Sequence, residues 1–171
     1  MGFTPLAGVM MGTRCGDIDP AIVTFLMKNL GMGVQEVEDL MNKKSGMLGV
    51  SGISSDARDI EDACKEGNEN AILTTDVYVN RIVNVVGGYY AQLGGADAIV
   101  FTGGIGENDA ALREEVCGYL TYLGLEIDTE KNSIRGEEVK ISTDSSKVNV
   151  YVIPTNEELA IARDTLAVIS E

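Results

Sequence analysis

The chain of 171 residues contains no histidine, so the most common general base and metal ligand of proteins is not available to it. A Ser–His–Asp or Cys–His nucleophile system cannot be built from this chain alone. The cysteines Cys15, Cys64 and Cys117 are widely spaced and form no CxxC pair, so we expect free thiols and no structural zinc site. Any chemistry must use carboxylates, arginine, lysine, backbone dipoles or a metal held by oxygen ligands.

Long apolar segments are missing as well. No uninterrupted run of about 18 apolar residues occurs, which is the length that a membrane-spanning helix needs. The N-terminus lacks the basic region followed by an apolar one that marks a secretory signal. We therefore expect a cytoplasmic protein. The chain has no tryptophan and 5% aromatic residues, so its core must consist of Ile, Val, Leu and Met side chains.

Positive charge is scarce, with 13 Lys and Arg against 27 Asp and Glu and a formal net charge of −14. Nucleic acids and anionic membranes bind clustered Lys and Arg, so neither is an expected partner. A phosphorylated ligand would need a few local cations, backbone N–H groups or a metal to overcome this field. Because apolar residues make up 44% of the chain, we expect it to fold, and its length fits one domain.

Helical and strand patterns alternate along the chain, which is typical of the α/β class. The pair Gly87-Gly88 interrupts the longest helical pattern, either as a close packing contact or as a kink. The glycine-punctuated segment 45–55 is expected to be a loop. The apolar run at 97–101 has the composition of a buried strand in a parallel sheet. The predicted helices cover 20–30, 34–44, 56–67, 69–93, 109–123 and 156–169, and the predicted strands cover 97–101 and 148–154.

The first segment that could carry chemistry is FTGGIGEN, residues 101–108. Glycines let the backbone approach a ligand closely, and the N-terminus of the helix that follows favours an anion or a polar nucleotide group. The segment is neither a Walker A loop nor the dinucleotide fingerprint, because its glycine spacing differs and no GK[ST] follows. Taken alone, such a strand-to-helix turn is as often structural as functional.

The second segment, MGTRCGDIDP, places Arg14 between glycines just ahead of a helix. A guanidinium offers a planar fork that suits carboxylate or phosphoryl oxygens. The local alternative is a surface arginine paired with Asp17 or Asp19, and on local evidence this alternative is favoured.

The third segment, IPTNEELAIARD, begins the last helix. Asn156 can cap that helix, and Glu157 and Glu158 in its first turn are favoured by the helix dipole without any function. The functional alternative makes one of these carboxylates a magnesium ligand. Here too the structural interpretation is favoured locally.

Taken together, six segments resemble the C-terminal half of the acetate kinases, in the same order and at compatible spacing: MGFTPLAG, MGTRCGDIDP, NKKSGMLGVSG, SSDARD, FTGGIGEN and IPTNEELAIARDT. The resemblance covers essentially the whole chain. It implies the actin-like, ribonuclease H-like ATPase domain of the sugar-kinase, Hsp70 and actin superfamily. Residues 1–171 would be a truncated C-terminal nucleotide-binding domain with a closing C-terminal helix.

The resemblance also implies an activity: transfer of the γ-phosphoryl group of ATP to acetate, reversibly, with Mg²⁺ or Mn²⁺. Arg14 matches the arginine that contacts the transferring phosphoryl group, Glu157 the carboxylate of the magnesium site, and Pro5 a wall of the pocket for the acetate methyl group. The implied nucleotide-binding residues are Asp56, Ala57, Arg58, Gly104, Ile105, Gly106, Glu107 and Asn108.

The same resemblance implies that the N-terminal half is absent, and with it an Asn near the magnesium, a second Arg, an Asp and the catalytic His. A hairpin that carries a glycine-rich phosphate loop would precede Met1. We therefore expect the isolated chain to be inactive, although its relatives form homodimers largely through this part. A missing hairpin would also leave an exposed strand edge, which favours an edge-to-edge or swapped dimer.

Two alternatives stay open. The chain could be a free-standing, non-catalytic nucleotide-binding or dimerisation module derived from such an enzyme. It could also belong to a related kinase that acts on propionate or butyrate, because an apolar pocket discriminates by only about 1–3 kcal/mol per methylene.

Overall fold

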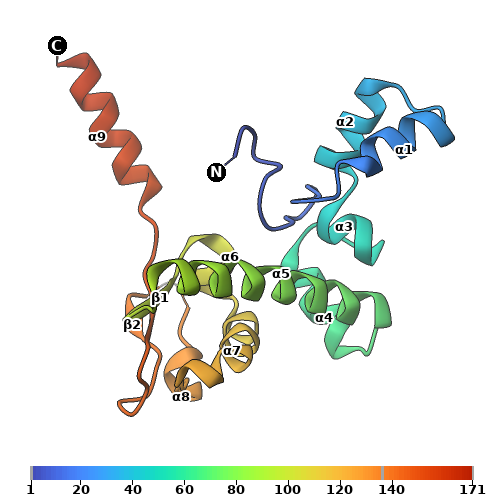
Figure 1. Ribbon diagram of the computed structural model, residues 1–171. Coiled ribbons are helices and arrows are strands. Elements are labelled where there is room, and N and C mark those ends of the chain that lie inside the picture. The colour runs from blue at the N-terminus through green and yellow to red at the C-terminus, as the bar shows by residue number, and fades with distance from the viewer. Residues whose placement is uncertain (1, 136, 171) are drawn as a thin grey trace. The chain divides into compact units, whose positions relative to one another are not determined.

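The computed structural model describes residues 2–135 and 137–170. The chain divides into two compact units, Met1–Gln92 and Leu93–Glu171, and Figure 1 labels their helices and strands. No helix of the described residues is long and apolar enough to cross a membrane. The prediction that residues 1–171 form part of a single domain stays a prediction, and each unit is described by itself.

The regular elements described in the first unit are all helices. Four of its helices match the predicted ranges, because turn and cap residues fix their ends. Asp19 Oδ1 accepts the N–H of Ala21 at 2.8 Å at the start of the first helix, and Gly31 with φ of 68° follows its end. Its elements are α1 (Ala21–Asn29), α2 (Val34–Lys43), α3 (Gly46–Ser51), α4 (Ala57–Lys65) and α5 (Glu69–Leu93).

The expectation of a loop over 45–55 is wrong, because α3 lies within it. The helix is too short to be stable from its own bonds. Its first N–H groups find acceptors elsewhere in the chain: Met47 N donates to Met11 O and Leu48 N to Gly12 O, each at 2.9 Å. Tertiary contact with the N-terminal segment therefore makes this glycine-rich stretch helical.

The helix α5 runs without interruption through Gly87 and Gly88. A Cβ atom at either glycine would meet nothing within 4 Å outside its own turn of the helix, so the alternative of a close packing contact is not seen in the described residues. Val79 of this helix is fully buried. The core of this unit consists of Met10, Val37, Met47, Ile60, Ala71 and Val79, with Ser51 and Thr74 buried among them.

The second unit contains a three-stranded sheet in the order β1-β3-β2. Strand β3 (Asn149–Val152) pairs in parallel with β1 (Ala98–Phe101) and antiparallel with β2 (Val139–Lys140). The helices of this unit are α6 (Gly103–Asn108), α7 (Ala110–Tyr119), α8 (Thr129–Asn132) and α9 (Glu157–Ile169), with the 3₁₀ turn η1 at Thr121–Leu123. Both predicted strands are confirmed, whereas β2 and α8 were not expected from the sequence.

The parallel pairing predicted for 97–101 is correct, but the predicted burial of this strand is wrong. Val100 exposes 48% of its surface, and Ala98 is also exposed. Strand β1 stands at one edge of the sheet, so among the described residues only β3 covers it laterally. Parallel strands are usually covered on both faces, and β1 has the apolar composition of such a strand without that cover.

The core of the second unit includes one face of β3 and one face of α7. Val150 and Val152, two residues apart in β3, point to the same side and are fully buried. The other buried apolar residues of this unit are Leu112, Val116, Cys117, Leu120, Leu125, Ile141 and Val148. Burial raises the pKa of the Cys117 thiol to about 12. All three cysteines are free, as predicted.

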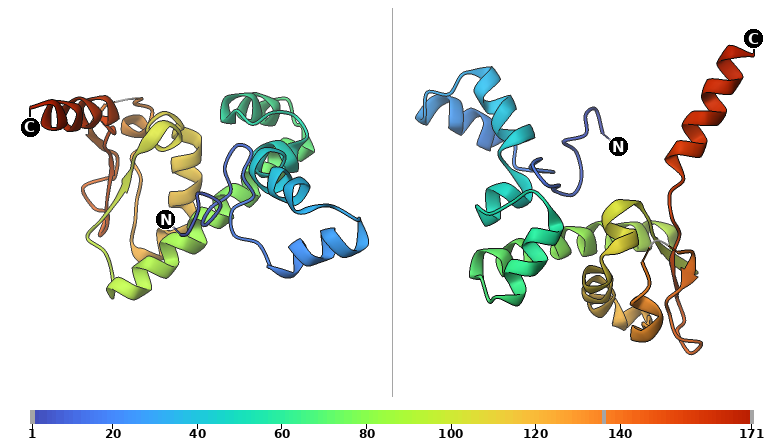
Figure 2. Two further views of the ribbon diagram at one scale, coloured as in Figure 1. Left: turned by 90° about the horizontal axis from the view of Figure 1, so that it is seen from above. Right: turned by 180° about the vertical axis from the view of Figure 1, so that it is seen from behind.

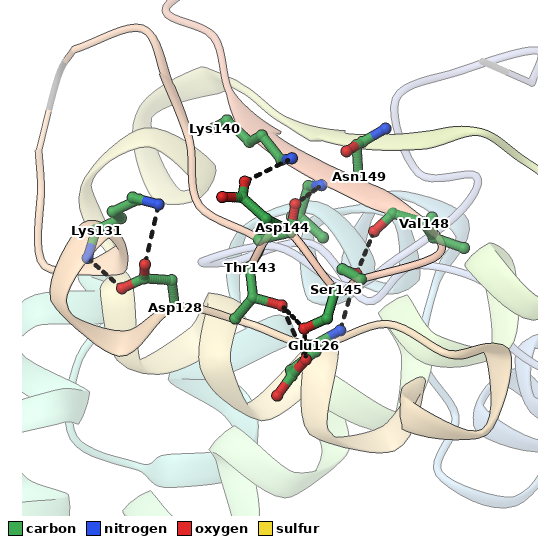
Figure 3. Close-up of polar contacts among 12 residues, drawn as sticks. Glu126, Asp128, Lys131, Lys140, Thr143, Asp144, Ser145, Val148 and Asn149 are labelled. Carbon is green, nitrogen blue, oxygen red and sulfur yellow. Dashed lines mark hydrogen bonds and ion pairs between the residues drawn. The ribbon is translucent and has the colours of Figure 1, made fainter.

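Hydroxyl groups hold the turn between β2 and β3 (Figure 3). Glu126 Oε2 accepts the hydroxyl of Thr143 at 2.8 Å and that of Ser145 at 2.6 Å. These two bonds lower the pKa of Glu126. The carboxylate therefore fixes a turn that lies far from it in sequence.

The last helix, α9, begins where predicted, and Asn156 caps it by accepting the N–H of Leu159 at 3.1 Å. Every described residue of α9 is exposed, including Ile161 at 65% and Val168 at 75%. Figure 2 shows it as a single helix that leaves the sheet through a short connection. The predicted closing helix is present, but in this structure it covers no core.

The buried position of Ile141, with 0% exposed surface, yields a stability prediction. We expect Ile141→Ala to lower the free energy of unfolding by about 3 kcal/mol, because it leaves a cavity in the core of the second unit. Urea unfolding followed by circular dichroism measures the loss. The matched control, Ile161→Ala, removes the same atoms from an exposed site, and equal losses in the two variants would contradict the assigned core.

Candidate functional site

The glycine segment predicted to bind a nucleotide is itself a helix. The sequence predicted a turn at 101–108, whereas residues Gly103–Asn108 form α6. Side chains compensate for the low helix propensity of its glycines. Glu107 Oε1 accepts the N–H of Gly103 at 2.8 Å, and Asn108 Nδ2 donates to Gly104 O at 2.8 Å.

A buried arginine bonds to the backbone of this helix. Arg113 is fully buried, and its Nη1 donates to Gly106 O at 2.9 Å. Its Nε donates to Asn132 Oδ1 at 2.8 Å, and its Nη2 donates to Asn132 O and Ile134 O at 2.6 and 3.0 Å. Burial lowers the pKa of Arg113, and carbonyl oxygens replace the water that the guanidinium loses.

Sequence reasoning did not find this arginine, although a signal was present. Residues 113, 116, 117 and 120 follow the i, i+3, i+4, i+7 spacing of a buried helix face. Val116, Cys117 and Leu120 are buried as that spacing predicts. A single charged residue in such a stripe indicates a buried polar network.

The sheet brings the glycine helix and the predicted magnesium carboxylate to one edge. The carboxyl ends of parallel strands lie on the same side, and Phe101 of β1 is in register with Val152 of β3. Glu107 Oε1 also accepts the N–H and the hydroxyl of Thr155, at 2.7 and 2.9 Å. The backbone bond from Thr155 is the main cause that lowers the pKa of Glu107.

Glu157 is the first residue of α9 and is exposed. Mg²⁺ is usually bound through one or two carboxylates together with substrate phosphates, and an exposed glutamate next to the glycine helix fits that mode. Among residues 2–135 and 137–170, no group of three His, Cys, Asp or Glu side chains could hold a metal ion by itself. Glu157 would thus be a ligand shared with the nucleotide.

In the first unit, backbone bonds fix the turn that carries Arg14. Met11 N donates to Arg14 O at 3.0 Å, and Ser45 N donates to Thr13 O at 2.9 Å. A side chain at Gly46 would collide with the carbonyl of Met11, so only glycine allows this approach. The turn is therefore fastened to the beginning of α3.

The local alternative for Arg14, an ion pair with Asp17 or Asp19, is not seen in the described part of the chain. Asp17 Oδ1 accepts the N–H of Gly8 at 2.8 Å, and Asp19 caps α1. The half-buried guanidinium of Arg14 instead donates to the sulfur of Met11 at 3.5 Å.

Arg14 lines an open hollow of about 410 Å³ together with Thr13, Gln35, Glu38, Asp39, Asn42 and Lys43. Lys43 pairs with Asp39 at 2.8 Å. Arg14 is thus the cation of this hollow that has no carboxylate partner among the described residues.

The segment Asp56–Arg58 begins α4. Asp56 Oδ1 accepts the backbone N–H of Arg58 at 2.9 Å, and the Arg58 guanidinium grips the carboxylate with bonds of 3.0 and 2.6 Å. The side chain of Arg58 lowers the pKa of Asp56 to about 2. A Cβ atom at Gly12 would lie 2.5 Å from Ser55 O, so this segment adjoins the turn that carries Arg14. Ala57 is the first residue of the helix.

Pro5 lies in a turn in which Ala7 N donates to Thr4 O at 3.3 Å, a position that favours proline. It is exposed. The turn alone thus explains a proline at this position. The predicted role of Pro5 beside an acetate methyl group stays a prediction.

Comparison with known proteins decides the family. The acetokinase family matches residues 1–163. An acetate kinase from Clostridium botulinum (strain Loch Maree / Type A3) is 61% identical over 165 residues, which are 96% of this chain and 42% of that protein. This chain belongs to the acetokinase family.

Other acetokinase relatives agree. An acetate kinase from Clostridium novyi (strain NT) is 56% identical over the whole chain and 43% of its own length. The crystal structure of Porphyromonas gingivalis acetate kinase superposes with a TM-score of 0.92 at 50% identity, covering 99% of this chain and 43% of that one. A propionate kinase from Francisella tularensis superposes with a TM-score of 0.88 at 42% identity, covering 95% and 41%.

These findings confirm two predictions. The acetokinase family was identified correctly from six motifs. Acetate kinases have the actin-like ATPase fold, so the predicted α/β fold class is correct. The chain spans about 42% of the length of the curated relatives that it matches. The residue roles proposed from the resemblance stay predictions.

The Asp56–Arg58 pair makes a prediction about acid titration. A depressed pKa means that the pair stabilises the fold above the ordinary value of 3.8 and stops doing so as the pH falls towards about 2. We expect carboxyl NMR to give a pKa of about 2 for Asp56 in the chain. The pKa should rise in Arg58→Ala and stay low in the control Lys43→Ala, and an unchanged pKa in Arg58→Ala would contradict the ion pair.

Proposed function

We propose that this chain is the C-terminal, nucleotide-binding part of an acetate kinase, which transfers the γ-phosphoryl group of ATP to acetate and gives acetyl phosphate and ADP, reversibly. The observation that carries the proposal is the 61% identity to an acetate kinase over 96% of the chain. The shared edge of β1 and β3, from which the connections to α6 and to Glu157 both leave, supports it. The activity would require an N-terminal half like that of the relatives.

In the second unit, the proposed nucleotide contacts are the residues of α6 from Gly104 to Asn108. The surface at Gly104 is open, because a Cβ atom there would meet nothing within 4 Å of it. A flat nucleoside can approach such a backbone closely. Glu157 would hold Mg²⁺ or Mn²⁺, which when bound neutralises phosphate charge. This local cation would offset the net charge of −14.

In the first unit, Arg14 is the proposed catalytic residue. Phosphoryl transfer depends mainly on positioning and on stabilising the charge of the transferred group. A guanidinium without a carboxylate partner, on a turn fixed by backbone bonds, suits that task. Asp56, Ala57 and Arg58 would line the adenosine pocket, and Pro5 would contact the methyl group of acetate.

Two further possibilities belong to the same proposal. The resemblance to a propionate kinase of known structure keeps propionate and butyrate as candidate substrates. A non-catalytic nucleotide-binding or dimerisation module also stays possible. We further propose a cytoplasmic location and a homodimer.

Calorimetric titration with ADP and Mg²⁺ tests the nucleotide site directly. We expect the chain to bind ADP and Gly104→Val to lower the affinity at least tenfold, about 1.4 kcal/mol, because a side chain there would stand between ligand and backbone. The matched control is Gly118→Val, since Gly118 is also a helical glycine with open space around it. No binding by the unchanged chain, or equal losses in both variants, would contradict a nucleotide site at α6.

The proposed catalytic role of Arg14 would depend on an N-terminal half like that of the relatives. We expect the chain alone to form no measurable acetyl phosphate in a hydroxylamine assay. A chimaera in which it replaces the matching segment of the Clostridium botulinum enzyme should be active, and Arg14→Ala should lower its kcat about 10³-fold. The control Lys43→Ala removes another cation from the same hollow, and a similar loss there would contradict a special role for Arg14.

A further inference from the structure

One carboxylate oxygen in the second unit receives all the hydrogen bonds of its side chain. Glu107 Oε1 accepts the N–H of Gly103 at 2.8 Å, the N–H of Thr155 at 2.7 Å and the hydroxyl of Thr155 at 2.9 Å. Hydrogen bonds to an ionised acceptor are about twice as strong as neutral ones. The side chain is half-buried, and the bonds lower its pKa, so the charged form is the one that these donors favour.

These bonds join two connections that follow different strands. Gly103 is the first residue of α6 after β1, and Thr155 lies between β3 and α9. The ladder between the strands ends with the bond from Ile153 N to Phe101 O at 3.0 Å. Beyond that bond, the Glu107 carboxylate supplies the hydrogen bonds between the two connections in the described residues.

The position of Thr155 gives the link its importance. The next residue, Asn156, caps α9, and the one after it, Glu157, is the proposed metal ligand. No residue of α9 is buried, so packing does not fix where this helix begins. The bonds from Thr155 to Glu107 are thus the main restraint on the direction in which Glu157 enters the site.

The other end of α6 is fixed independently. Arg113 holds Gly106 O at 2.9 Å from within the core. Arg113 thus holds the backbone of α6 at Gly106, and Glu107 connects the same helix to the segment that precedes α9.

From this arrangement we propose that Glu107 is a positioning residue that holds α6 and the beginning of α9 together, and that the effect of the divalent cation on nucleotide affinity depends on this link. The first part stands on the hydrogen bonds alone, and the second rests on the proposed nucleotide and metal roles. Glu107 would thus act through Thr155 and Gly103. For this one residue of α6, that action replaces the direct nucleotide contact proposed above.

Two variants separate the link from the charge. Glu107→Ala removes the acceptor of all three bonds, whereas Glu107→Gln keeps a carbonyl oxygen that can accept them. The matched control is Glu126→Ala, which removes another carboxylate that accepts two hydroxyl groups in the same unit (Figure 3) and does not touch either connection.

Amide hydrogen exchange, measured by NMR without any ligand, tests whether Glu107 holds the amides of Gly103 and Thr155. We expect Glu107→Ala to lower the protection of the Thr155 and Gly103 amides at least tenfold, while Glu107→Gln retains most of it and Glu126→Ala leaves it unchanged. Protection that survives Glu107→Ala would overturn the proposal. If Glu107→Ala fails to fold, Thr155→Val, which removes only the hydroxyl donor, should still lower the protection of Thr155 severalfold, and no change there would overturn the proposal as well.

ADP titration of the same variants, with and without Mg²⁺, tests whether the effect of the cation on ADP affinity depends on Glu107. We expect Mg²⁺ to raise the ADP affinity of the chain and of Glu107→Gln, and to raise it much less in Glu107→Ala. An undiminished Mg²⁺ effect in Glu107→Ala would overturn the coupling. If the unchanged chain binds no ADP, the proposed function fails for this chain, and hydrogen exchange alone then decides whether Glu107 holds the two connections.

Discussion

The parallel pairing of β1 with β3 is the constraint on which the candidate site of the second unit depends. Parallel neighbours send their following segments to the same edge of a sheet, and here those segments are the glycine helix and the beginning of α9. The paired residues are 51 positions apart in the chain, since Ala98 pairs with Asn149. A slip of one residue would turn Val150 and Val152 out of the core, so core packing also fixes the register of the site.

Electrostatics explains why fixed backbone matters so much in this chain. With 27 acidic and 13 basic side chains, the general field opposes a phosphorylated ligand. Arg58 is neutralised by Asp56 and Arg113 is buried, so neither offers a free charge on the surface. Under the proposed function, the backbone of α6, a bound metal ion and the guanidinium of Arg14 would favour such a ligand, and each would be effective only when it is held in place.

Local signals predicted most helices and both longer strands. Caps such as Asp19, Asp56 and Asn156, and glycines such as Gly31, determine helix ends through neighbouring residues, so the sequence shows them directly. The helix α3 was missed because its N–H groups bond to the distant residues Met11 and Gly12. The helix α6 was missed because its glycines predict a turn, whereas Glu107 within it and Arg113 of the next helix supply the stabilising bonds. The bond between Glu107 and Thr155 spans 48 positions, and no periodicity encodes such a pair. Motif resemblance named the candidate site residues, but only the coordinates separate Glu107, whose carboxylate bonds to Gly103 and Thr155, from Gly104, which is open.

The open face of α6 has a consequence for how such a surface changes during evolution. At Gly104 the surface presents backbone peptide groups instead of side chains. A peptide group has the same chemistry whichever residue it belongs to. Substitutions there can add bulk but cannot grade a preference between one nucleobase and another. Under the proposed nucleotide role of α6, variation in nucleotide choice would have to arise from residues around this helix and not from the helix itself.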